Sequence, residues 1–95
     1  MNQQDPARRH PRAAEARRLV EAGIVHFGAG RLAKAGQAYR EALELVPGHP
    51  RALHLLGVLA HHRGRHGVAV KLIRQAIERR PNVAAFHNNL GNALR

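Results

Sequence analysis

The 95-residue sequence contains no cysteine, serine, threonine or tryptophan. Without a thiol or an aliphatic hydroxyl, acyl-enzyme catalysis has no nucleophile to use, and neither a disulfide nor a cysteine-based zinc site can form. Aromatic residues make up only 3% of the chain, so a core must be built from Leu, Val, Ile and Ala. We therefore expect one small, helical domain.

Acidic residues are also scarce. Six Asp and Glu face sixteen Lys and Arg, which gives a net charge of +10 and favours acidic partners. The glutamates are scattered, and even Glu41 and Glu44, one helical turn apart, form no general acid–base pair. We expect no enzyme within these residues and no cofactor.

The first twelve residues, MNQQDPARRHPR, hold two prolines and three arginines and show no apolar periodicity. This composition predicts a flexible basic arm over residues 1–12, followed by a folded domain over 13–95. The chain has neither the apolar run of a signal peptide nor a stretch long enough to span a membrane. We expect a cytoplasmic protein with no membrane partner.

An internal repeat organises the remainder of the chain. Gly23, Gly57 and Gly91 are spaced 34 residues apart, and the same interval relates several proline, alanine and leucine pairs. These pairs are Pro47 and Pro81, Ala35 and Ala69, Ala42 and Ala76, Leu19 and Leu53, and Leu56 and Leu90. The interval predicts repeats near 16–49 and 50–83 and a partial repeat over 84–95.

Each complete repeat contains two helical segments. Apolar residues recur at three- and four-residue steps, Gly30 and Gly64 interrupt them, and Pro47 and Pro81 end the second segment of each repeat. We expect five helices, near 13–28, 31–45, 51–63, 66–79 and 84–94, and no strand. Gly57, Ala69 and Ala76 would let paired helices approach closely, with Ile73 filling the adjoining space.

The residue pattern resembles the tetratricopeptide repeat, a 34-residue helix-turn-helix unit with the motif W-x2-L-G-x2-Y, A-x3-F and P. The second repeat carries the motif as Leu53, Leu56, Gly57, Ala60, Ala69, Ile73, Ala76 and Pro81, and the first as Leu19, Ala22, Gly23, His26, Ala35, Tyr39, Ala42 and Pro47. The third begins with His87, Leu90, Gly91 and Leu94. The resemblance implies an all-α fold, stacked as a short right-handed α-solenoid.

In the family that the chain resembles, the first helix of each repeat lines a concave groove that holds an extended peptide. The resemblance implies a scaffold whose partner is a protein or peptide with some acidic character. By motif position, the groove residues would be Arg17, Val20, Ile24, Phe27, Arg51, His54, Val58, His61, Asn88 and Asn92. The third repeat stops before its second helix, so self-association through this end is a further expectation.

Two other functions stay open, and a third, metal binding, is not expected. The segment HNNLGNAL resembles repeats of O-linked N-acetylglucosamine transferases and related bacterial glycosyltransferases, which implies an amino-terminal part of such an enzyme. Exposed arginines leave RNA binding as an alternative, although stacking aromatics are nearly absent and nucleic acid is disfavoured. His61, His62 and His66 lie close in sequence, but no carboxylate accompanies them, and we expect no metal site.

Overall fold

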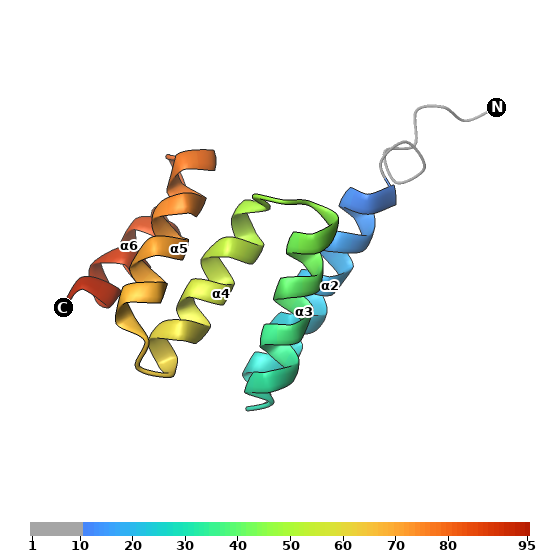
Figure 1. The fold of residues 1–95 in the computed structure, drawn as a ribbon, viewed down its shortest axis with the longest axis horizontal. Helices are drawn as coiled ribbons and strands as arrows, with labels where there is room; N and C mark the ends of the chain where they lie inside the picture. The colour runs from blue at the N-terminus through green and yellow to red at the C-terminus, as the bar shows by residue number, and fades with distance from the viewer. Residues whose placement is uncertain (1–10) are drawn as a thin grey trace. The chain divides into compact units, whose positions relative to one another are not determined.

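The structure is a computed structural model that describes residues 11–95. The described chain forms five helices and no strand: α2 (Pro11–Gly28), α3 (Leu32–Leu45), α4 (Pro50–His62), α5 (His66–Arg79) and α6 (Ala84–Leu94) (Figure 1). The all-α prediction is confirmed, with each helix boundary within two residues of the expected position. The chain divides into two compact units. The first unit ends at Pro47, and the second begins at Gly48.

The predicted arm falls almost entirely on residues 1–10, which lie outside the described residues. Its last two residues, Pro11 and Arg12, are instead helical and belong to α2.

The first unit is a pair of helices, α2 packed against α3. Its centre is the Tyr39 ring, only 1% exposed, which lies directly over Gly23 of α2. A Cβ at Gly23 would collide with the ring atoms of Tyr39, so the glycine is what lets the aromatic side chain fit between the two helices.

The second unit holds the pair α4 and α5, with α6 packed mainly on α5 and also touching α4. Here Gly57 takes the place of Gly23, and Ile73 takes the place of Tyr39. The predicted close approach is confirmed, because a Cβ at Gly57 would lie 2.7 Å from Ile73 Cγ1 and 3.2 Å from the Ala69 carbonyl oxygen. Ala69, Ile73 and Ala76 are all fully buried.

The turn inside each helix pair has the same geometry in both units. Gly30 and Gly64 each adopt φ +80°, a left-handed conformation that costs glycine little. After each glycine a backbone N–H reaches back across the turn, from Arg31 to the His26 carbonyl and from Arg65 to the Ala60 carbonyl, both at 2.8 Å. This Schellman motif ends the first helix and starts the second at a fixed point, as the two glycines predicted.

The turns that follow the second helices differ from each other. Gly48, after α3, also has φ +80°, whereas no residue of the turn between α5 and α6 has a positive φ. His49 caps α4, because its Nδ1 accepts a hydrogen bond from the Ala52 N–H at 3.3 Å. Val83 precedes α6 and supplies no side-chain cap.

Candidate functional site

The ten predicted groove residues lie on the first helix of each repeat, and each unit holds its own set. In the first unit, Arg17 is exposed and Ile24 and Phe27 are half-buried on α2. Val20 differs from the prediction because its side chain is 0% exposed. It belongs to the core and leaves no surface for a ligand.

In the second unit, six predicted residues are shared between α4 and α6. Arg51, Asn88 and Asn92 are exposed, and Val58 and His61 are half-buried. His54 was expected to face a ligand, but its side chain is only 7% exposed. The difference arises because α6 covers it.

His54 joins α4 to α6. Its ring lies against Phe86, with the ring centroids 4.5 Å apart. Its Nε2 lies 2.8 Å from Nδ2 of Asn89, and it accepts a hydrogen bond from this amide in the tautomer that carries the ring proton on Nδ1. Burial, and after it the positive charge of Arg51, lowers the pKa of His54 below its ordinary value. The imidazole is thus a structural contact between two helices.

Asn89 was not among the predicted groove residues, yet it connects that contact to the surface. Its Oδ1 accepts a hydrogen bond from Nδ2 of Asn92 at 3.5 Å, while its own Nδ2 donates to His54. A chain of hydrogen bonds therefore runs from exposed Asn92 through Asn89 to buried His54. The sequence contains little indication of this role for Asn89, because the role depends on a histidine of α4 that packs against α6.

Asn88 and Asn92 are four residues apart, so their side chains occupy neighbouring positions on one face of α6. Each amide offers both a donor and an acceptor, as a peptide backbone does. We call these two residues the asparagine face. Arg51 of α4, in the same unit, adds a guanidinium group that suits carboxylates. The arrangement supplies groups for holding a polar chain.

The turn between α4 and α5 brings two of the three neighbouring histidines together. Nδ1 of His61 lies 2.9 Å from Nδ1 of His66, and the ring centroids are 4.8 Å apart. A hydrogen bond of this kind needs a proton on one Nδ1 and a lone pair on the other. Residues 11–95 contain no group of three or more side chains arranged to hold a metal ion.

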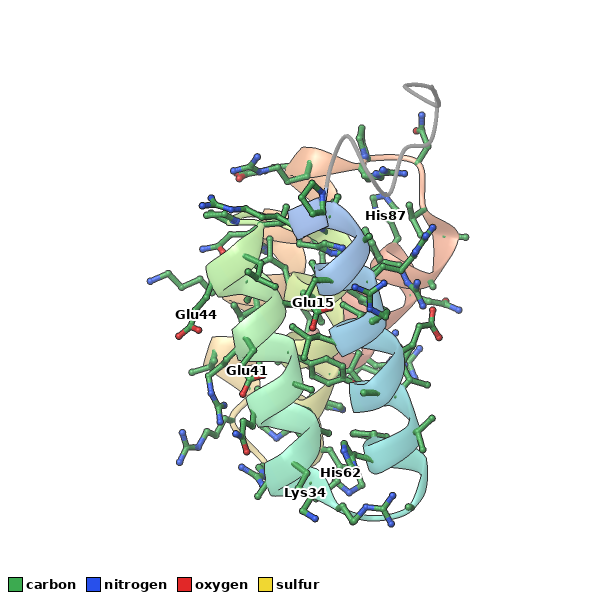
Figure 2. All side chains as sticks on the ribbon, turned by 90° about the vertical axis from the view of Figure 1, so that its right-hand side faces the viewer. Glu15, Lys34, Glu41, Glu44, His62 and His87 are labelled. Atoms are coloured by element: carbon green, nitrogen blue, oxygen red, sulfur yellow. The ribbon has the colours of Figure 1, made fainter. Side chains whose placement is uncertain are left out.

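The carboxylates of the described chain lie on the surface of the helices. Glu15 pairs with Arg18 at 2.7 Å, and Glu41 accepts a hydrogen bond from Gln37 at 3.1 Å. Figure 2 shows Glu44 projecting outward from α3, near the opposite end of that helix from Lys34. None of the helices in residues 11–95 is long and apolar enough to cross a membrane.

Comparison with known proteins gives matches along the whole described chain. A family model described as tetratricopeptide repeat matches residues 7–50, 20–83 and 63–95. Human tetratricopeptide repeat protein 7A is 35% identical over 65 residues, which are 68% of this chain and 8% of that protein. Mouse tetratricopeptide repeat protein 7B is 32% identical over 59% of this chain and 7% of its own length.

A solved structure with the same fold is a variant of the O-GlcNAc transferase of Thermobaculum terrenum. It matches 99% of this chain and 17% of its own chain, with a TM-score of 0.85 and 31% sequence identity. The chain therefore spans less than a fifth of each of these relatives.

Proposed function

Because this chain belongs to the tetratricopeptide repeat family, whose repeats generally mediate protein–protein interaction, we propose that it is a scaffold that binds an extended peptide. The site is the asparagine face of α6 together with Arg51 of α4. The partner carries acidic residues, and the setting is the cytoplasm. The protein acts by binding and performs no chemistry of its own.

The observation that carries this proposal is the hydrogen-bonded support beneath the asparagine face. Asn92 donates to Asn89 at 3.5 Å, and Asn89 donates to buried His54, so the Asn92 Nδ2 has a partner on its own helix. Its Oδ1 is then presented as an acceptor for a peptide N–H, at little cost in side-chain entropy. Asn88, exposed on the same face, offers a second amide.

Charge supports the choice of an acidic peptide. The chain carries +10, so a partner of opposite sign is attracted over the whole surface and associates faster at low salt. Arg51 is exposed at the first turn of α4, where its guanidinium can meet a carboxylate in a bidentate arrangement. General attraction and a specific contact therefore favour the same class of ligand.

A second candidate function follows from the solved structure. An O-GlcNAc transferase contains a region that matches nearly all of this chain. In this alternative the chain is the repeat region of a larger glycosyltransferase, and its peptide site presents a substrate protein to a catalytic domain elsewhere. The sequence that follows Arg95 in the source gene tests this alternative directly.

The test of the primary proposal is a screen of acidic peptides against the wild-type chain and the double variant Arg51→Ala, Asn92→Ala. We expect the best peptides to lose at least about tenfold in affinity, equivalent to 1.4 kcal/mol, when both groups are removed. Arg74→Ala is the matched control, since it removes the same charge from an exposed position on α5. Equal losses in the control and the double variant would contradict the proposed site.

The same screen distinguishes RNA binding. Affinity for nucleic acid falls steeply with salt because phosphate contacts release counterions, and it would respond alike to removing Arg51 or Arg74. Tight RNA binding with such a salt dependence, and no peptide selected, would replace the peptide proposal.

A further inference from the structure

The positive charge of the chain is concentrated in the second unit. Residues 48–95 contain eight Lys and Arg and one acidic residue, Glu78, which gives this unit a net charge of +7. Residues 11–47 of the first unit contain six Lys and Arg and four Glu, for a net charge of +2. An anionic ligand is therefore attracted more strongly to the second unit than to the first.

Part of this charge lies where α5 ends and α4 begins. The guanidinium group of Arg79, the last residue of α5, lies against the backbone of Gly48. A Cβ at Gly48 would be 2.9 Å from Nε of Arg79 and closer still to the rest of the guanidinium group. The glycine therefore leaves the space that this group occupies, and the contact keeps Arg79 beside the turn before α4.

Two further arginines act on the same turn. Burial lowers the pKa of His49, and the positive charges of Arg51 and, to a smaller extent, Arg80 lower it further. Such an effect requires charges within a few ångströms, so both arginines lie near the His49 ring. Arg79 and Arg80 are exposed, and neither forms an ion pair with a carboxylate of residues 11–95. We call Arg79, Arg80 and the turn formed by Gly48 and His49 the arginine corner.

We propose that the arginine corner binds a phosphate group on a side chain of the peptide partner, an inference that rests on the proposed function. A phosphate monoester carries nearly two negative charges and three acceptor oxygens. Each guanidinium group can donate two parallel hydrogen bonds to such oxygens. Two neighbouring arginines without a carboxylate partner match this ligand in both charge and geometry.

The arginine corner adjoins the site proposed for the peptide. Arg51 belongs to that site and, from the first turn of α4, also acts on His49. In addition, Nε2 of His87 donates a hydrogen bond to the Pro81 carbonyl at 2.6 Å, which holds the start of α6 against the turn that follows α5. Asn88 of the asparagine face is the next residue of the chain. A peptide that contacts Arg51 and Asn88 can therefore reach the corner with a phosphorylated side chain.

Arg79 and Arg80 also have a structural role to be separated from binding. Cations at the C-terminal end of a helix interact favourably with its dipole, so both residues stabilise the end of α5. Arg63 stands in the same way at the end of α4, and Arg65 follows it in the turn between α4 and α5. This second pair of exposed arginines lies at the opposite end of the same two helices and provides a matched control.

The first probe is phenyl phosphate, titrated into the isotope-labelled 95-residue chain at about pH 7.5, where a phosphate monoester is close to a dianion. Nuclear magnetic resonance follows the backbone amide signals. We expect saturable changes at Gly48, His49 and Arg80. The dissociation constant should be at least about fivefold lower than that of benzoate, which has one charge and two acceptor oxygens.

The double variant Arg79→Gln, Arg80→Gln removes both guanidinium groups of the corner. We expect it to bind phenyl phosphate at least about tenfold more weakly than wild type. The control double variant Arg63→Gln, Arg65→Gln removes the same charge, and we expect it to weaken binding less than about twofold, because salt screens distant charges. Far-ultraviolet circular dichroism checks that both variants stay folded.

The second probe is the best acidic peptide from the screen described above, synthesised with phosphoserine or serine at each position in turn. Fluorescence anisotropy measures its binding. At one position we expect phosphoserine to strengthen binding at least about tenfold over serine in wild type and in the control variant. In the Arg79→Gln, Arg80→Gln variant the same phosphoserine should strengthen it less than about twofold.

Failure of this proposal can be told apart from failure of the proposed function. If phosphoserine strengthens peptide binding at no position, or if both double variants weaken phenyl phosphate binding equally, the phosphate site is refuted while the peptide site stands. If no peptide binds at all, the proposed function fails and the phosphopeptide proposal fails with it. A single-stranded RNA that binds more tightly than the phosphorylated peptide, with the loss confined to the corner variant, would assign the phosphate to nucleic acid and overturn the proposal.

Discussion

Replacing Gly57 and Gly91 by alanine, one at a time, should change stability in opposite directions although both glycines are helical and 34 residues apart. Alanine is favoured over glycine inside a helix by about 0.8–1.0 kcal/mol. At Gly91 nothing within 4 Å opposes this gain. The position is near the end of α6, where helices fray, so we expect Gly91→Ala to stabilise the second unit by about 0.5 kcal/mol.

At Gly57 the new methyl group would lie 2.7 Å from Ile73 Cγ1 and 3.3 Å from Leu72 Cβ. Ile73 is fully buried and branched at Cβ, so it has few other rotamers to adopt. Overpacking of this kind costs about 1–3 kcal/mol, which outweighs the helix propensity. We expect Gly57→Ala to destabilise the unit by about 1 kcal/mol, the difference between these two contributions.

Urea unfolding followed by circular dichroism would measure both changes in the free energy of unfolding, provided that the dependence on urea concentration (the m value) is the same for each variant. Because the two glycines lie in the same unit, one unfolding transition reports both. Equal free energies of unfolding for Gly57→Ala and Gly91→Ala would contradict this prediction. That outcome would mean that α4 and α5 separate at little cost and that their close approach is not what selects glycine.

Further changes test the packing, the turns and the buried histidine. Ala69→Leu should destabilise the second unit by about 1–3 kcal/mol in urea unfolding, because its surroundings are already full. Gly64→Ala should cost about 1 kcal/mol by the same measurement, since φ is +80° there, whereas Gly67→Ala, in open space within α5, should stabilise slightly. Because the folded state lowers the pKa of His54, the unfolded chain binds more protons as the pH falls below about 6.5. Stability should therefore be fully present above that pH and decline below it, and a His54→Asn variant should show a smaller decline in urea midpoint; an unchanged pH profile would contradict the assignment.

The helices could be predicted from the sequence because the 34-residue repeat places the same pairs of contacting residues in each repeat. Gly57 and Ile73 stand where Gly23 and Tyr39 stand one repeat earlier, so one pairing accounts for both units. Pro11 and Arg12 were assigned to the arm although they belong to α2, because residues 1–12 show no apolar periodicity that would indicate a helix.

The candidate site was harder to predict. Helical spacing placed His54 on the same stripe as Arg51 and Val58, but its burial depends on Phe86 and Asn89, which lie more than thirty residues away. Periodicity describes one helix at a time, whereas exposure depends on which helix comes to lie against it. The cap at His49 was also missed. Ser, Thr, Asp and Asn are the usual capping residues, and at the start of α4 an imidazole nitrogen takes their role.

The packing of α6 has a consequence for how the molecule opens. In residues 11–95 this helix packs mainly on α5 and only slightly on α4, whereas α4 and α5 pack along each other, so fewer interactions must break before the amide protons of α6 reach solvent. Hydrogen–deuterium exchange should therefore be faster across α6 than across α4 or α5. A peptide bound to the asparagine face would slow this exchange, and the amides whose exchange slows would show which side of the helix the peptide covers.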